Sequence, residues 1–218
     1  MNLRAALRHA WAKPLVLGFL LLPFAFLVLG IFEQSLGPNP AEYLIRSTGE
    51  LALRMLCLTL LITPLRVQLT LPELAKFRRG LGLLTFFYAF MHALCYSLLD
   101  MELVWEDIVK DIWKRPFILV GALSFVLLTL LAGTSFNRAV KALGAQRWRK
   151  LHQAVYVIAG LAILHFFWMR SVVGGYLNAW KLETEKLRYL SLPFFSLYSW
   201  PRFFCLLKYI NQVYQNKF

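Results

Sequence analysis

The chain has 218 residues, of which 59% are hydrophobic and only 16% are charged, and its formal net charge is +13. Soluble proteins contain about 45–50% apolar and about 25% charged residues, so this composition argues against a water-soluble globular fold. The positive charge alone would suggest nucleic-acid binding. However, the basic residues fall in short clusters between apolar runs, which is typical of the loops of a membrane protein and excludes a nucleic-acid partner as the main interpretation.

Uncharged apolar runs predict where the chain crosses the membrane. A helix needs roughly 17–25 mostly apolar residues to span the hydrocarbon core. Four runs meet this length, at residues 14–32, 81–99, 116–137 and 151–169. The sequence therefore predicts an all-α integral membrane protein whose surface is in contact with lipid.

Residues 43–65 are a fifth candidate span. They are long enough to cross a bilayer, although they contain three charged side chains. Thr63-Pro64 is predicted to end this helix, because proline disfavours the continuation of a helix. By the same logic Pro116 is predicted to begin a helix, since the first helical position accepts proline.

Residues 189–207 are the sixth and weakest candidate. Pro193, Pro201 and Arg202 interrupt this apolar stretch, so it is predicted to be a kinked helix or one that lies on the membrane surface. The sequence as a whole predicts a bundle of about six transmembrane helices with an irregular last one. They form a single domain over residues 1–218.

The charges of the loops predict the orientation of the bundle. Lysine and arginine gather in the N-terminal tail and in the loops at 66–79 and 138–150, where Glu73 is the one acidic residue. The loop at 33–42 has no lysine or arginine. Because cytoplasmic loops carry an excess of basic residues, the N-terminus and the two basic loops are predicted to be cytoplasmic.

Two histidines lie inside separate uncharged runs, His92 in 81–99 and His165 in 151–169. A polar imidazole is costly in hydrocarbon, so an intramembrane histidine is a candidate functional residue. Both runs cross the membrane in the same direction, and the depths of the two histidines differ by only about 4.5 Å. We therefore predict that the two rings face each other and bind one haem iron in the outer half of the membrane. The alternative is that each histidine only hydrogen-bonds a neighbouring helix.

His152 is a third candidate ligand, thirteen residues before His165 and therefore about 20 Å away along a helix, at the cytoplasmic edge. Thirteen residues before His92 stands Arg79, where a second haem of the same design would need a histidine. His152 and Arg79 are counted as candidate cofactor-binding residues. His152 can ligate a second haem with another partner, contact a flavin or quinone, or be a simple interfacial histidine.

Arg46, Glu50 and Arg54 are spaced four residues apart and lie on one helix face. Glu50 can neutralise one arginine, and the remaining positive charge suits a haem propionate or a quinone. Arg46 and Arg54 are therefore candidate cofactor-binding residues. The alternative is an ion pair that faces other helices without a cofactor.

Several stretches resemble the MsrQ (YedZ) family, which comprises the haem-binding membrane subunits of the bacterial periplasmic methionine-sulfoxide reductase system. This family belongs to the ferric-reductase-like transmembrane superfamily. The similarity covers roughly residues 40–170 and leaves 171–218 as an atypical C-terminal segment. The stretches that carry it are STGELALRMLCLTLLITPL (47–65), FRRGLGLLTFFYAFMHALCYSLL (77–99), KRPFILVGALSFVLLTLLAGTS (114–135) and LGAQRWRKLHQAVYVIAGLAILHFFW (143–168).

The resemblance implies a multi-pass protein of the bacterial inner (plasma) membrane that binds b-type haem, with one haem expected and a second left open, and with FMN as a further cofactor. It implies that His92, His152 and His165 are the haem-binding histidines. It also implies electron transfer from a cytoplasmic flavin reductase or the quinone pool to a periplasmic molybdopterin-containing methionine-sulfoxide reductase subunit. The chain itself would then be an electron-transfer subunit rather than the catalytic one.

Two other interpretations stay open at this point. One is a stand-alone ferric or quinone reductase of the same superfamily, which needs no partner. The other is a non-redox membrane assembly factor whose histidines are structural. An absorption spectrum of the purified protein distinguishes the assembly factor from the redox proteins, because a protein without a redox cofactor is colourless.

Overall fold

The computed structural model describes residues 3–172. By its internal contacts the chain divides into two compact units, Met1–Trp168 and Met169–Phe218. The boundary lies close to residue 171, where the sequence begins to depart from the resembling family. The predicted sixth span at 189–207 lies outside the described residues.

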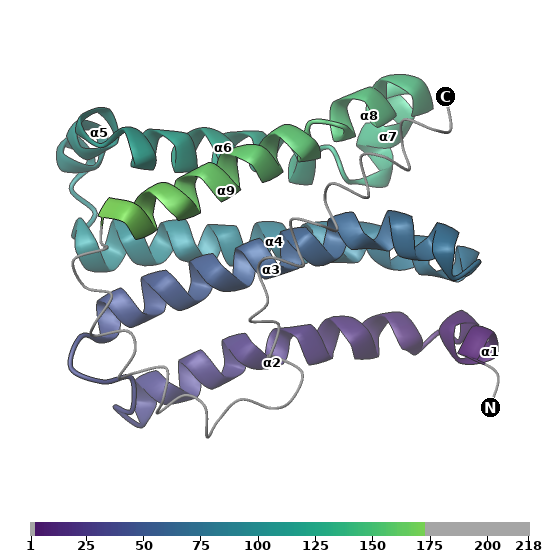
Figure 1. Cartoon of the computed structure of the whole chain (residues 1–218), viewed down its shortest axis with the longest axis horizontal. Coiled ribbons are helices and arrows are strands. Elements are labelled where there is room, and N and C mark those ends of the chain that lie inside the picture. Colours follow the sequence, from purple (N-terminus) through teal and green to yellow (C-terminus); the bar gives the residue numbers. More distant parts are fainter. Residues whose placement is uncertain (1–2, 173–218) are drawn as a thin grey trace. The chain divides into compact units, whose positions relative to one another are not determined.

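The described residues form helices joined by short connections (Figure 1). Most of them run along a common direction, with α5 at one end of the bundle and α1, α7 and α8 at the other. Their bounds are α1 Leu3–Arg8, α2 Ala12–Phe32, α3 Pro40–Gln68, η1 Pro72–Leu74, α4 Ala75–Cys95, η2 Tyr96–Asp100, α5 Trp105–Lys114, α6 Pro116–Gly133, α7 Asn137–Leu143, α8 Ala145–His152 and α9 Val155–Val172.

Four candidate membrane spans are found among the described residues, at Ala12–Phe32, Pro72–Asp100, Pro116–Gly133 and Ala145–Arg170. They correspond to the four uncharged runs. Large apolar side chains stay exposed along them, for example Phe19 and Phe26 on α2 and Leu123 and Val126 on α6. Apolar surface of this extent requires a lipid environment, so the prediction of an all-α membrane protein is confirmed.

The predicted fifth span at 43–65 lies within the single helix α3, which is 29 residues long and is not among these four candidate spans. It begins as a capped helix, because the Asn39 side chain accepts a hydrogen bond from the backbone N–H of Glu42 and proline occupies its first turn. The prediction that Thr63-Pro64 ends it was wrong, since α3 continues through Pro64 to Gln68. Membrane helices tolerate an interior proline, because neighbouring groups satisfy the freed carbonyl. Pro116 does begin α6, as predicted.

Two apolar clusters hold the bundle together. In the first, Leu27 of α2, Leu51 and Met55 of α3, and Leu84 and Tyr88 of α4 pack against one another. The second joins α3, α6 and α9 and consists of Leu56, Leu128, Leu131, Val155, Ile158 and Ala159. Since α3 contributes to both clusters, it connects α2 and α4 on one side with α6 and α9 on the other.

Polar contacts fix the two ends of the bundle. At the end that carries α5, the Tyr96 hydroxyl donates to Asp111 at 2.7 Å, and Arg115 donates to the same carboxylate at 2.8 Å. At the opposite end, Arg8 of α1 pairs with the side chain of Glu73 at 2.9 Å. The one acidic residue of the basic loops therefore holds the basic N-terminal tail.

Tyr88 offers a test of how α2 is attached to the bundle. Its side chain has 0% exposure, and its hydroxyl donates to the carbonyl oxygen of Leu20 at 2.7 Å. We expect Tyr88→Phe to lower the free energy of unfolding by about 0.6–1.7 kcal/mol, the range for hydrogen bonds between membrane helices. Tyr88→Ala should cost about 3–5 kcal/mol, because it also leaves a cavity. Denaturation of the detergent-solubilised protein measures both, and equal effects of the two changes would contradict this account.

Candidate functional site

His92 projects from α4 onto the neighbouring helix α3. Its ring nitrogen Nδ1 lies 2.8 Å from the backbone carbonyl oxygen of Ile45. The ring also lies against the α-carbon of Gly49, one helical turn further along α3. His92 is thus held by backbone atoms of α3.

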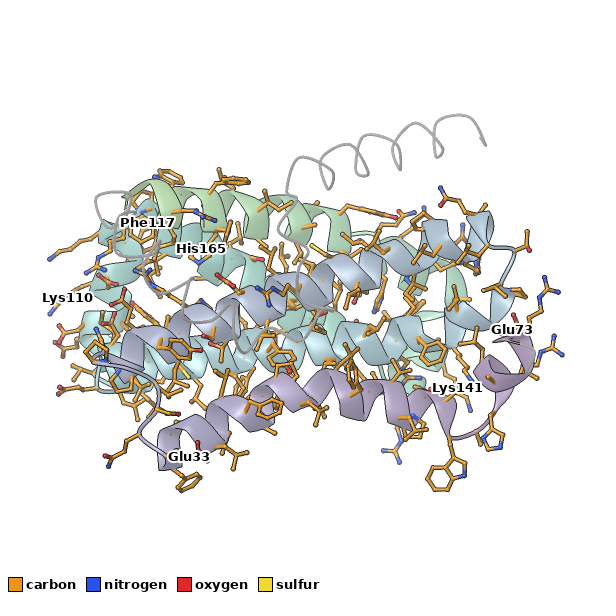
Figure 2. The ribbon with its side chains drawn as sticks, turned by 60° about the horizontal axis from the view of Figure 1, so that its bottom comes forward. Glu33, Glu73, Lys110, Phe117, Lys141 and His165 are labelled. Atoms are coloured by element: carbon orange, nitrogen blue, oxygen red, sulfur yellow. The ribbon has the colours of Figure 1, made fainter. Side chains whose placement is uncertain are left out.

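His165 projects from α9 onto α6 in the same manner. Its Nδ1 lies 2.7 Å from the carbonyl oxygen of Phe117, and its ring lies against Gly121. Figure 2 shows His165 and Phe117 together, towards the end of the bundle that carries Lys110 and away from Glu73 and Lys141. His165 therefore lies in the half of the bundle next to α5.

The structure brings His92 and His165 together. The centroids of the two rings are 6.3 Å apart, and the ring planes are inclined at 68°. The matched depths in the sequence predicted this proximity. The two helices that carry the histidines therefore present both imidazoles to one point between α3, α4, α6 and α9.

The hydrogen bonds determine which ring nitrogen is available. A carbonyl oxygen has no proton to donate, so in both histidines Nδ1 carries the hydrogen of the neutral ring. The other nitrogen, Nε2, then keeps its lone pair. This is the arrangement of a metal-binding histidine, in which the second nitrogen donates to a carbonyl or carboxylate that orients the ring.

The structure gives each candidate arginine of α3 a carboxylate partner. Arg54 pairs with Glu50 at 3.0 Å, as the spacing predicted. Arg46 forms an ion pair with Glu42, one turn earlier. Glu42 was not among the predicted site residues, although its position four residues before Arg46 was a usable signal. Each guanidinium therefore has part of its charge already balanced by a carboxylate of its own helix.

His152 and Arg79 lie at the opposite end of the bundle from the histidine pair. The His152 ring stacks on Trp148 with centroids 4.0 Å apart, Nδ1 lies 3.1 Å from the Trp148 carbonyl oxygen, and Nε2 lies 3.4 Å from the Ser135 hydroxyl. Arg79 donates to the side-chain oxygen of Asn137 at 2.6 Å. The structure does not bring these residues to the paired rings.

A groove of about 570 Å³ opens beside Arg79. Arg138 also lines it, so two arginines border this groove at the end of the bundle that carries α7. A groove with two cations and apolar walls is suited to an anionic group that also has an apolar part. The sequence singled out Arg79 but not Arg138.

Sequence reasoning missed the backbone partners of the two histidines. Ile45 and Phe117 act through their carbonyl oxygens, and a carbonyl oxygen leaves no mark in a sequence. Gly49 and Gly121 were visible, because a glycine inside a predicted membrane helix often marks a close approach between helices. Within residues 3–172, no group of three or more His, Cys, Asp or Glu side chains is arranged to hold a metal ion.

Fold and site together define a multi-pass helical membrane protein with a paired-histidine centre in the apolar interior of its bundle. Comparison with known proteins agrees with this class. The model of the family described as "Ferric reductase like transmembrane component" matches residues 48–163. No solved structure matches the chain significantly.

Curated relatives define the class more closely, and several of them are named protein-methionine-sulfoxide reductase heme-binding subunit MsrQ. The protein from Polaromonas naphthalenivorans is 56% identical over 76% of this chain and 75% of its own length. The protein from Herminiimonas arsenicoxydans is 48% identical over 69% of this chain and 69% of its own length. The protein from Ralstonia nicotianae is 45% identical over 78% of this chain and 76% of its own length. The chain belongs to the ferric-reductase-like transmembrane family and, within it, to the MsrQ family.

Proposed function

We propose that this chain is a haem b-binding electron-transfer subunit of a methionine-sulfoxide reductase system. It passes electrons from the cytoplasmic side or the quinone pool to a periplasmic molybdopterin-containing reductase. That reductase repairs oxidised methionine in envelope proteins. The names of the relatives support the system to which the chain is assigned. The distance between the rings of His92 and His165 carries the proposal that the chain itself holds the redox group.

His92 and His165 would hold a haem iron, because Nε2 of each ring is available as a ligand. Two imidazoles that shared one metal ion, each through a bond of about 2 Å, would bring their ring centroids to about 6 Å. The observed separation is 6.3 Å. Two protein ligands are too few for an ordinary protein metal site, but they suffice when a macrocycle supplies the remaining ligands. Haem, when bound, supplies one-electron chemistry.

The protein's own residues orient the two histidines, balance charge and exclude water at this centre. The carbonyl oxygens of Ile45 and Phe117 hold the two Nδ1 protons, so Nε2 of each histidine is free to bind iron. Arg46 and Arg54 of α3, each already paired with a carboxylate, would offer their remaining positive charge to propionate groups. The apolar clusters on either side keep water away from the centre. Together they hold the ligands in one geometry whether the electron is present or not.

The cytoplasmic end is the entry side of the proposed pathway. His152, Arg79 and the groove beside Arg79 lie at the end of the bundle where the basic tail and loops gather. This end accepts the electron donor, or binds a flavin or a second haem. The N-terminus lies on the cytoplasmic side of the inner membrane. The acceptor docks at the opposite end, near α5.

One spectrum tests this function. The purified protein in detergent should show the sharp absorption bands of low-spin haem b after dithionite reduction, with about one haem per chain at the paired histidines. A colourless protein, expressed with ample haem and correctly folded, would contradict the proposal and favour the assembly-factor interpretation. The description of the matching family model favours one second candidate, a ferric reductase. Rapid reduction of ferric chelates without any partner protein would support that candidate.

A further inference from the structure

The two histidines rest on matching backbone sites of two different helices. On α3, the carbonyl acceptor Ile45 is followed four residues later by Gly49, and on α6 the acceptor Phe117 is followed four residues later by Gly121. In each case one edge of the imidazole is hydrogen-bonded to the carbonyl while the ring lies over the glycine. We call each pair of carbonyl and glycine a seat.

An added side chain would crowd the histidine ring at both seats. A Cβ atom added at Gly121 would lie 2.9 Å from both Nδ1 and Cε1 of His165. One added at Gly49 would lie 3.0 Å from Nδ1 and 3.1 Å from Cε1 of His92. The atoms that would be displaced include the nitrogen that donates to the carbonyl. The ring therefore cannot yield to a methyl group without weakening that hydrogen bond or turning about its own axis.

We propose that Gly49 and Gly121 are positioning residues that set the tautomer and the ring plane of the two histidines. The inference rests on the proposed function in one respect, that these rings bind haem iron. Neither glycine touches the iron, and each acts through its histidine. Since α3 and α6 are different helices, the two seats are independent of each other.

The seats also define the relative orientation of the rings. The ring planes are inclined at 68°, far from parallel. Axial imidazoles with strongly crossed planes give a low-spin ferric haem a highly anisotropic electron paramagnetic resonance signal with one prominent low-field feature. Nearly parallel rings give a rhombic signal with three resolved features. The crossed arrangement held by the seats predicts the first type.

Glycine-to-alanine changes test the seats, with matched controls on the helices that carry the histidines. Gly160 of α9 has no atom within 4 Å of an added Cβ, and at Gly82 of α4 the nearest atom would be 4.0 Å away. Alanine is intrinsically favoured over glycine inside a helix, so Gly160→Ala and Gly82→Ala should leave the fold and the spectra unchanged. Gly121→Ala and Gly49→Ala should lower haem affinity by about 10- to 100-fold, as expected for groups that orient a ligand. Gly121→Ala should have the larger effect, because its contact is the closer one.

The first readout is the low-spin resonance signal of the haem that remains bound. It should lose its anisotropic low-field feature in each seat variant and keep it in both controls. The second readout needs no haem. In haem-free protein labelled with ¹⁵N-histidine, the Nδ1–H signature of His165 should change only in Gly121→Ala, and that of His92 only in Gly49→Ala.

The possible outcomes distinguish a failure of the proposal about the two glycines from a failure of the proposed haem-binding function. Seat variants that behave like the controls in both readouts overturn the proposal. Wild-type protein that binds no haem overturns the proposed function alone, and the histidine signals then still decide the role of the seats. If Gly121→Ala does not fold, Gly49→Ala decides the test, because its tight contacts need a shift of only a few tenths of an ångström.

Discussion

His92→Ala or His165→Ala is expected to abolish the low-spin haem spectrum and to reduce the haem-to-protein ratio at this centre to near zero. Each change removes one of two axial ligands, and the partner ring 6.3 Å away has no other histidine beside it to replace the lost one. The loss should exceed the roughly 10- to 100-fold effect of changing a group that merely orients a ligand. Absorption spectra and haem quantification of the purified variants measure the effect.

The matched control is His9→Ala, in the exposed N-terminal tail. It removes an imidazole from the same chain without touching the bundle, so its spectrum and haem content should equal those of the wild type. Variants must elute as the wild type does in size exclusion, which separates loss of a ligand from loss of the fold. A normal low-spin spectrum in both His92→Ala and His165→Ala would remove these residues from the site.

The matched depths of the two histidines could be predicted because depth depends on helix geometry and on the thickness of the bilayer. A rise of about 1.5 Å per residue converts sequence position into depth, and the bilayer fixes where each helix begins. An error of a few residues in the boundaries shifts a ring by only one helical turn. Hence the prediction survived although α9 begins at Val155 rather than at residue 151, after a break that separates it from α8.

The parts that escaped prediction depend on which helix lies beside which. The sequence places Gly121 inside an apolar run and Gly49 in the charged first half of the fifth predicted span, but only packing shows that a histidine ring covers each one. Likewise the continuation of α3 through Pro64 depends on its neighbours and not on the local preference of proline. Local rules therefore give the helices and the depths, whereas tertiary contacts decide the orientation of each ring.

The charged residues of α3 include one ion pair that the sequence predicted and one that it did not. The Glu50–Arg54 pair follows from a spacing of four residues, and the structure has it at 3.0 Å. The predicted surplus of positive charge was too large, because Glu42 balances Arg46. The error came from treating the first turn of α3 as a loop, so that Glu42 was left outside the helix. Any propionate at this face would therefore meet partly neutralised arginines.

Haem-free protein is expected to be markedly less stable than haem-loaded protein. His92 is fixed to α3 and His165 to α6, so ligation of one iron by both ties the pair α3–α4 to the pair α6–α9. A ligand that binds only the folded state at 100 to 1,000 times its Kd stabilises that state by about 2.7–4.1 kcal/mol. For a chain of this length the corresponding gain in Tm is roughly 5–15 °C.

Thermal unfolding followed by circular dichroism, in one detergent and at one protein concentration, measures this difference. Protein expressed under haem limitation is compared before and after addition of haem. His165→Ala is the control, because it keeps the helices but lacks one ligand, and added haem should leave its Tm nearly unchanged. An equal rise of Tm in the wild type and in His165→Ala would mean that haem binds elsewhere. No rise in either would mean that ligation does not join the two helix pairs. The size of the gain thus reports how much of the bundle is held by the paired imidazoles rather than by apolar packing alone.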